Sequence, residues 1–153
     1  MRISAIIPAY NAAKTIKACL EACRAQSTPP AEIIVVDDAS TDATGEIVRA
    51  FSDVLYLCQE HRGPAAARNL GAKAASGEFI AFTDADCIPH TDWLERLQRG
   101  FVDARVAAVG GTYGIAKPEY FLARIIHVEI RARHRQLGAE VDFLGSFNVA
   151  YRK

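Results

Sequence analysis

Three short runs of this sequence, 3–8, 33–36 and 79–83, are apolar at odd and even positions alike. This pattern is typical of strands that are covered on both faces, as in a parallel sheet with helices on each side. Segments with helical spacing separate the runs along the chain. The sequence therefore predicts an α/β fold with a mostly parallel sheet flanked by helices.

The same patterns predict where each element lies. Strands are expected at 3–8, 33–36, 54–58, 79–83 and 106–109, and helices at 12–25, 43–51, 65–75, 92–101 and 119–137. Asn11 precedes the first helical pattern and is expected to cap it. The alternation shows no linker and no internal repeat, so we expect residues 1–153 to form part of a single domain.

Polar residues follow three of the predicted strands, at the point where each strand ends. They are Tyr10-Asn11, Asp37-Asp38 and Asp84-Ala85-Asp86. In open α/β sheets, ligands bind in the crevice outside the carboxyl ends of the strands. The sequence therefore predicts one pocket that these three clusters share.

The acidic pair Asp84 and Asp86 has two interpretations. Two carboxylates at a strand end can reach one hard cation, and Mg²⁺ and Mn²⁺ prefer oxygen ligands and share them with substrate phosphates. The same residues could instead form an acidic turn before the helix that starts near Asp92. The spacing alone fits both interpretations equally.

Asp37-Asp38 and Tyr10 also have a binding and a structural interpretation. An acid after a strand can accept hydrogen bonds from a ribose or a base N–H, while Ser40 and Thr41 indicate ordinary turn chemistry. Two adjacent carboxylates repel each other, which favours binding for one of them. Tyr10 could stack on a base, but its position alone favours packing beneath the first helix.

Basic residues lie before and on the third predicted helix. His61, Arg62 and Arg68 could place a cation near a diphosphate, although a lone arginine more often lies on a solvated helix face. The small residues of 65–72 indicate close packing of this helix, so Arg68 requires a partner.

Charge and cysteine content exclude some classes of protein. Lys plus Arg equals Asp plus Glu, 18 each, which gives no support for nucleic-acid binding. The four cysteines form no CxxC pair, and we expect buried, reduced thiols. The amino terminus has no leader pattern, and no apolar run is long enough to span a membrane, so a cytoplasmic location is expected.

Four motifs in register resemble family 2 glycosyltransferases. They are the segments 6–11 (IIPAYN), 34–42 (IVVDDASTD), 63–69 (GPAAARN) and 77–86 (GEFIAFTDAD), and the closing segment 147–153 resembles the strand after the sugar pocket in that family. The resemblance covers essentially the whole chain. It implies a GT-A fold, Rossmann-like and incomplete on its carboxyl-terminal side.

The resemblance also implies roles for individual residues. The nucleotide-sugar would be bound by Pro8, Tyr10, Asp38, Arg68 and Asp84, and the divalent metal, Mn²⁺ or Mg²⁺, by Asp86. Tyr10 would pack against the base, Asp38 would accept from its N–H, and Asp37 would support the loop. The donor expected from the family is a UDP-sugar.

The implied activity is sugar transfer with inversion to a cell-surface polysaccharide or glycolipid acceptor. The general base of the family lies beyond position 153, and Glu140 and Asp142 do not match its motif. The isolated chain could therefore bind donor without transferring it, and the alternative is a non-catalytic nucleotide-sugar-binding or interaction module. A dinucleotide-binding oxidoreductase is disfavoured because the turn at 8–13 contains no glycine.

The segment 119–137 combines apolar residues with Arg and His. One interpretation is a helix on an anionic membrane surface near a lipid-linked acceptor, which would place the protein peripherally at the inner face of the cell membrane. The other is an amphipathic helix packed against protein, and the apolar face that any packed helix needs favours this second interpretation.

Overall fold

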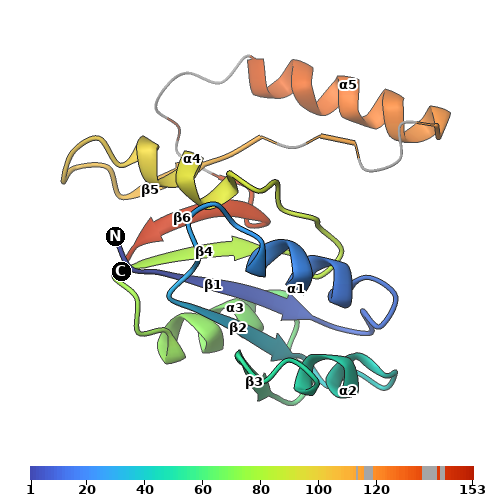
Figure 1. Cartoon of the computed structure of the whole chain (residues 1–153). Helices are drawn as coiled ribbons and strands as arrows, with labels where there is room; N and C mark the ends of the chain where they lie inside the picture. Colours follow the sequence, from blue (N-terminus) through green and yellow to red (C-terminus); the bar gives the residue numbers. More distant parts are fainter. Residues whose placement is uncertain (113, 116–118, 136–140, 142–143) are drawn as a thin grey trace.

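The computed structural model describes residues 1–112, 114–115, 119–135, 141 and 144–153. Its strands are β1 (Ile3–Ala9), β2 (Glu32–Asp37), β3 (Val54–Cys58), β4 (Phe79–Thr83), β5 (Ala108–Gly110) and β6 (Asn148–Arg152). Its helices are α1 (Ile16–Arg24), α2 (Thr44–Arg49), α3 (Pro64–Ala74), α4 (Trp93–Gly100) and α5 (Phe121–Arg135). The described strands form one sheet in the order β3-β2-β1-β4-β6-β5 (Figure 1).

The sheet is mostly parallel, as predicted. β1 lies at its centre between β2 and β4, both parallel to it, and β3 extends the parallel part beyond β2. β6 is antiparallel to both β4 and β5 and lies between them. The carboxyl ends of β1, β2 and β4 therefore meet at one edge, where Tyr10, Asp38 and Asp84 follow them.

Two apolar cores cover the faces of the sheet. Every residue of β1 is buried, and its side chains contribute to both cores. On one face, Ile3 and Ile7 pack with buried residues of α1 and α4. On the other face, Ile6 packs with Ile34 of β2 and with Ala67 of α3. Burial on both faces explains why β1 is apolar at odd and even positions.

The first helix begins later than the sequence predicts. α1 starts at Ile16, and Asn11 does not cap it but lies in the left-handed region with φ 49°. The Asn11 side chain instead accepts a hydrogen bond from the Thr41 backbone N–H at 2.8 Å. The prediction of a cap was wrong because the side-chain oxygen of Asn11 accepts a hydrogen bond from a distant turn instead.

The burial predicted for the four cysteines was correct for only two of them. All four are free thiols, and Cys19 and Cys23 are buried on α1, but Cys58 is exposed and Cys87 is half-buried. Cys58 ends β3, an outer strand of the sheet, which explains its exposure. A hydrogen bond with Cys23 and burial raise the pKa of the Cys19 thiol well above its ordinary value, so this thiol stays protonated.

The basic, apolar segment forms the helix α5, although positions 136–140 lie outside the described residues. Figure 1 places α5 beyond α4, at the opposite end of the molecule from β3. Within the described part of the chain, no helix combines the length and apolar character needed to cross a bilayer. Glu140 and Asp142, the late acids of the sequence, also lie outside the described residues.

Candidate functional site

A cavity of about 480 Å³ opens at the edge of the sheet where β1, β2 and β4 end. The residues predicted to bind nucleotide-sugar and metal all line it: Pro8, Tyr10, Asp38, Arg68, Asp84 and Asp86. They come from the ends of three neighbouring strands and from α3. The strand-end rule therefore predicted the location of the cavity, while the roles of its residues stay predictions.

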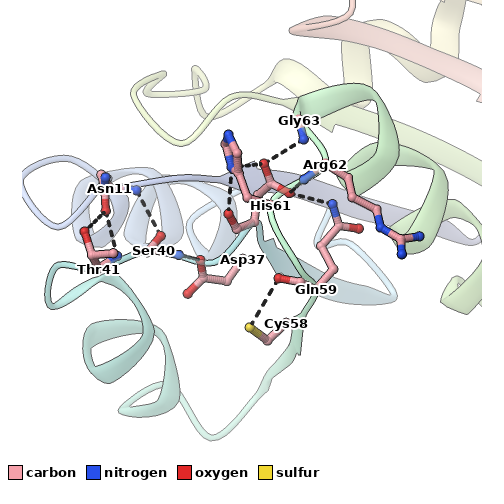
Figure 2. Close-up of polar contacts among 10 residues, drawn as sticks. Asn11, Asp37, Ser40, Thr41, Cys58, Gln59, His61, Arg62 and Gly63 are labelled. Atoms are coloured by element: carbon pink, nitrogen blue, oxygen red, sulfur yellow. Dashed lines mark hydrogen bonds and ion pairs between the residues drawn. The ribbon is translucent and has the colours of Figure 1, made fainter.

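Reciprocal hydrogen bonds join the two loops beside the cavity. Asn11 N donates to Ser40 Oγ at 2.9 Å, and Thr41 N donates back to Asn11 Oδ1 at 2.8 Å (Figure 2). Ala12 N donates to Thr44 Oγ1 at 2.8 Å, which ties the same loop to the start of α2. The loop that carries Tyr10 is therefore held at two successive backbone positions.

Tyr10 is half exposed and lines the cavity. It stacks on the imidazole of His61, with ring centroids 4.5 Å apart and planes tilted by 36°. The position of Tyr10 alone favoured packing beneath the first helix, but the ring lies at the cavity instead. An aromatic face placed there is suited to stacking on a nucleobase.

Asp38 lies at the end of β2 and is only 3% exposed. Its Oδ1 accepts from Gln59 Nε2 at 2.6 Å and from Arg62 N at 2.8 Å, and its Oδ2 accepts from Gly63 N at 2.8 Å. His61 Nδ1 lies 2.9 Å from the same Oδ2 (Figure 2). A carboxylate has about four acceptor sites, and these donors match that number.

Burial alone would raise the pKa of Asp38, because it disfavours the charged form. The hydrogen bonds from Arg62, Gln59 and Gly63, together with the nearby His61, act in the opposite direction and outweigh burial. The pKa of Asp38 is therefore lowered, and the carboxylate stays ionised in the cavity wall. Gly63 makes its contact from a backbone with φ 84°, which favours glycine at this position.

Asp37 lies outside the cavity lining and holds the neighbouring turn. Its Oδ1 accepts from Ser40 N at 2.8 Å and its Oδ2 from the Tyr56 hydroxyl at 2.7 Å. Burial and the Asp37 carboxylate raise the pKa of the Tyr56 phenol above its ordinary value, so Tyr56 stays a donor. Adjacent acids thus make different contacts, with Asp37 bracing its own loop and Asp38 anchoring residues 59–63.

Arg68 links α3 to the end of β4 across the cavity. Its Nη2 lies 2.6 Å from Asp84 Oδ1, and the arginine side chain is 16% exposed. Arg68 Nε is buried without a hydrogen-bond partner among the described residues. The guanidinium thus has the protein partner that the sequence required.

Asp86 is exposed at the mouth of the cavity, and its Oδ1 lies 3.8 Å from the Cys87 thiol. The described residues contain no group of three or more His, Cys, Asp and Glu side chains able to enclose a metal ion. Mg²⁺ commonly takes one or two carboxylates and completes its shell with water and substrate phosphates. Asp84 and Asp86 both line the cavity, and two carboxylates are the number that such an ion commonly takes.

Two residues beside Asp38, His61 and Gln59, make contacts that the sequence did not predict. Sequence reasoning treated His61 only as a cation near the pocket, whereas its ring stacks on Tyr10 and contacts Asp38. Gln59 belongs to none of the sequence motifs, and it donates to the same carboxylate. The signal in the sequence was the pair of adjacent acids after the apolar run 33–36. Acids that follow a buried strand need hydrogen-bond donors nearby.

Comparison with known proteins gives one consistent family. Residues 4–153 match the family model described as Glycosyl transferase family 2. Glycosyltransferase AglE of Haloferax volcanii is 41% identical over 123 residues, which are 76% of this chain and 40% of that protein. Glycosyltransferase GlyA of Streptococcus pneumoniae is 37% identical over 123 residues, or 77% of this chain and 18% of that protein.

Solved structures agree with this family. The mannosyltransferase PcManGT of Pyrobaculum calidifontis, in complex with GDP-Man and Mn²⁺, superposes with a TM-score of 0.75 at 28% identity, covering 99% of this chain and 44% of that one. The chain thus spans less than half the length of each of these three proteins. On the match of its sequence and the superposition of its sheet, the chain belongs to glycosyl transferase family 2 and has the GT-A fold.

Proposed function

We propose that the cavity binds the nucleotide part of a nucleoside-diphosphate sugar, and that the protein transfers the sugar with inversion to a carbohydrate or lipid-linked acceptor. The observation that carries the proposal is the meeting of Tyr10, Arg68 and the Asp84–Asp86 pair around one cavity. PcManGT, which shares the fold, was solved with GDP-Man and Mn²⁺. Its ligands support a nucleotide-sugar and a divalent cation as the ligands of this chain.

Each group at the cavity suits one part of such a donor. The Tyr10 ring would stack on the base, and the Arg68 guanidinium would place its positive charge beside the diphosphate. Asp86, with Asp84 beside it, would hold the divalent cation, which supplies Lewis-acid stabilisation of the departing diphosphate when bound. A carboxylate base would deprotonate the acceptor hydroxyl, and no described residue is assigned that role.

Calorimetric titration of UDP, GDP and dTDP into the purified chain tests the proposal, with Mn²⁺ and then with EDTA. We expect binding of UDP that requires Mn²⁺ and falls at least about tenfold in Asp86→Ala, because the variant loses an oxygen ligand of the cation. Asp53→Ala is the matched control, because Asp53 is also exposed but pairs with Arg24 outside the cavity. If folded protein binds none of the three nucleotides in Mn²⁺, the proposal is wrong. Binding of UDP without release of UDP from UDP-sugars would favour the non-catalytic module.

We also propose that α5 contacts the anionic inner surface of the cell membrane. Five large apolar residues of α5 are exposed in the described part of the chain: Phe121, Leu122, Ile125, Ile126 and Val128 are 46–74% exposed. The sequence of α5 contains six Arg or His residues and one acid, Glu129. This excess of basic residues complements anionic lipid.

Two other helices of the same chain differ from α5 in the charge of their polar residues. The polar faces of α1 and α4 mix signs, with Lys17 beside Glu21 and Arg99 beside Glu95. A helix that only packs against protein needs the apolar face but not an excess of basic residues. This excess is therefore the feature that favours lipid over protein as the partner of α5.

Sedimentation with vesicles tests the membrane contact. We expect binding to vesicles that contain phosphatidylglycerol, weakened by salt, and little binding to phosphatidylcholine alone. Phe121→Ser combined with Leu122→Ser should abolish it, whereas Val102→Ser should not, although Val102 is 80% exposed outside α5. Equal binding to both lipids, no binding, or covering of α5 by a second copy of the chain would contradict the proposal.

A further inference from the structure

The imidazole of His61 makes the same contacts that a nucleobase would make in the cavity. It is an aromatic heterocycle that stacks on the exposed ring of Tyr10, 4.5 Å away between centroids. Its Nδ1 lies 2.9 Å from Asp38 Oδ2 and 3.2 Å from the Asp38 backbone oxygen. A base that packs on Tyr10 and donates an N–H to Asp38 requires both of these contacts.

The other donors to Asp38 belong to the framework of the protein. Arg62 N and Gly63 N are backbone groups of the segment that leads into α3, at 2.8 Å each. Gln59 Nε2 approaches the same carboxylate at 2.6 Å from the residue after β3. With these three in place, the carboxylate has one acceptor site left, and His61 occupies it.

His61 is the donor that can leave without disturbing the fold. Its side chain is 59% exposed, whereas the Asp38 side chain that it contacts is 4% exposed. A surface imidazole changes rotamer easily, and its departure leaves the backbone donors unmoved. The contacts therefore divide into a fixed set that positions the carboxylate and one exchangeable contact, made by His61, which lines the cavity.

We infer that His61 is an internal ligand of the nucleobase subsite, which the base of the donor displaces from Asp38 and from Tyr10. This inference rests on the proposed function, because it concerns the same cavity. The competition lowers the apparent affinity for donor by the fraction of molecules in which His61 fills the subsite. His61 thus sets how tightly the base is held without touching the diphosphate or the sugar.

Calorimetric titration of UDP in Mn²⁺ tests the inference, comparing the unaltered chain with His61→Ala. Removing one charge-assisted hydrogen bond that competes with the base should tighten UDP binding roughly three- to tenfold. Inorganic diphosphate in Mn²⁺ is the matched ligand, since it has no base and its affinity should not change. Glu60→Ala is the matched variant, because Glu60 is the exposed neighbour of His61 and should leave both affinities unchanged.

A second variant and a measurement of folding distinguish the possible results of this titration. His61→Phe keeps a ring for Tyr10 but has no N–H for Asp38, so it should also bind UDP more tightly than the unaltered chain. Thermal unfolding of each variant verifies that the protein is folded. Unchanged or weaker UDP binding in folded His61→Ala overturns the inference, because His61 would then assist the base or play no part. If the unaltered chain binds no nucleotide at all, the proposed function fails instead.

Discussion

At the scale of single residues, neighbouring donors decide what each carboxylate of the site can do. Asp38 is buried and surrounded by hydrogen-bond donors, and Asp84 forms an ion pair with Arg68. Asp86 is exposed and contacts only the weak thiol donor of Cys87 among the interactions described for it. The three carboxylates therefore differ in their surroundings: Asp38 anchors a neighbouring loop, Asp84 is ion-paired, and Asp86 is available to a cation.

The surroundings of Asp38 predict a large cost for removing its charge. Asp38→Asn places an amide N–H₂ against donors that need an acceptor, so we expect the free energy of unfolding to fall by about 2–4 kcal/mol. Urea denaturation followed by fluorescence measures this change. Asp53→Asn, at an exposed ion pair, should cost less than about 0.5 kcal/mol. Equal stability of the two variants would contradict the anchoring role.

The lowered pKa of Asp38 also predicts a direction for pH dependence. Its pKa in the folded protein lies below that in the unfolded chain, which is about 3.9. The stabilisation from Asp38 is therefore complete above about pH 4 and is lost as the pH falls through the folded-state pKa. Stability measured between about pH 6 and pH 3 should fall less steeply in Asp38→Asn than in the unaltered chain. An identical slope would show that other acids carry the acid sensitivity.

At the scale of elements, the close approach of α3 to the sheet places Arg68 at the cavity. Gly71 faces β1, and a Cβ built there would lie 2.5 Å from Ile6 Cγ2 and 3.2 Å from Val36 Cγ2. The helix can approach this closely only because the position has no side chain. One turn earlier, Arg68 lies within reach of Asp84 at the end of β4.

Gly71→Ala should therefore destabilise the protein, although alanine favours helix by about 1 kcal/mol over glycine. We expect the free energy of unfolding to fall by about 1–3 kcal/mol, because the added methyl pushes α3 away from Ile6. Lys73→Ala, at an exposed position of the same helix, should change stability by less than about 0.5 kcal/mol. A Gly71→Ala variant as stable as the unaltered protein would show that α3 can shift without cost.

At the scale of the whole molecule, β6 joins the last described segment of the chain to its centre. The strand lies between β4 and β5, and Val149 and Ala150 on it are fully buried. Asn148, at its start, accepts from the Trp93 indole at 2.9 Å and donates to the Thr112 carbonyl at 2.7 Å. One side chain thus connects α4, β6 and the segment after β5.

Asn148→Ala removes both contacts and leaves the Trp93 N–H without this acceptor. We expect the free energy of unfolding to fall by about 1–3 kcal/mol. Trp93 is the single tryptophan, so the emission maximum of the folded protein reports directly on this contact. Asn69→Ala, at an exposed position of α3, is the control and should alter neither value. An unchanged emission spectrum in Asn148→Ala would mean that the indole is held by packing alone.

The order of strands and helices and the edge that carries the cavity were predictable from the sequence. Apolar runs and helical spacing are local patterns, so they predicted every element except β6, with bounds that differ from the structure by a few residues. Only the family resemblance indicated the strand β6. The polar residues at the strand ends predicted the cavity because parallel strands end at one edge. The partner of Arg68 was anticipated but not identified, since the ion pair joins two separate elements.

Only the tertiary structure decided what the individual side chains contact. Asn11 was expected to cap α1, but it bonds Thr41, which is 30 positions away. His61 stacks on Tyr10 and bonds Asp38, which is 23 positions away, and no local pattern encodes that meeting. A sequence pattern reflects the neighbours along the chain, whereas hydrogen bonds and ring contacts depend on how separate elements approach each other. The sequence therefore determined where a site forms, and the packing of the loops determined which groups in it remain available to a ligand.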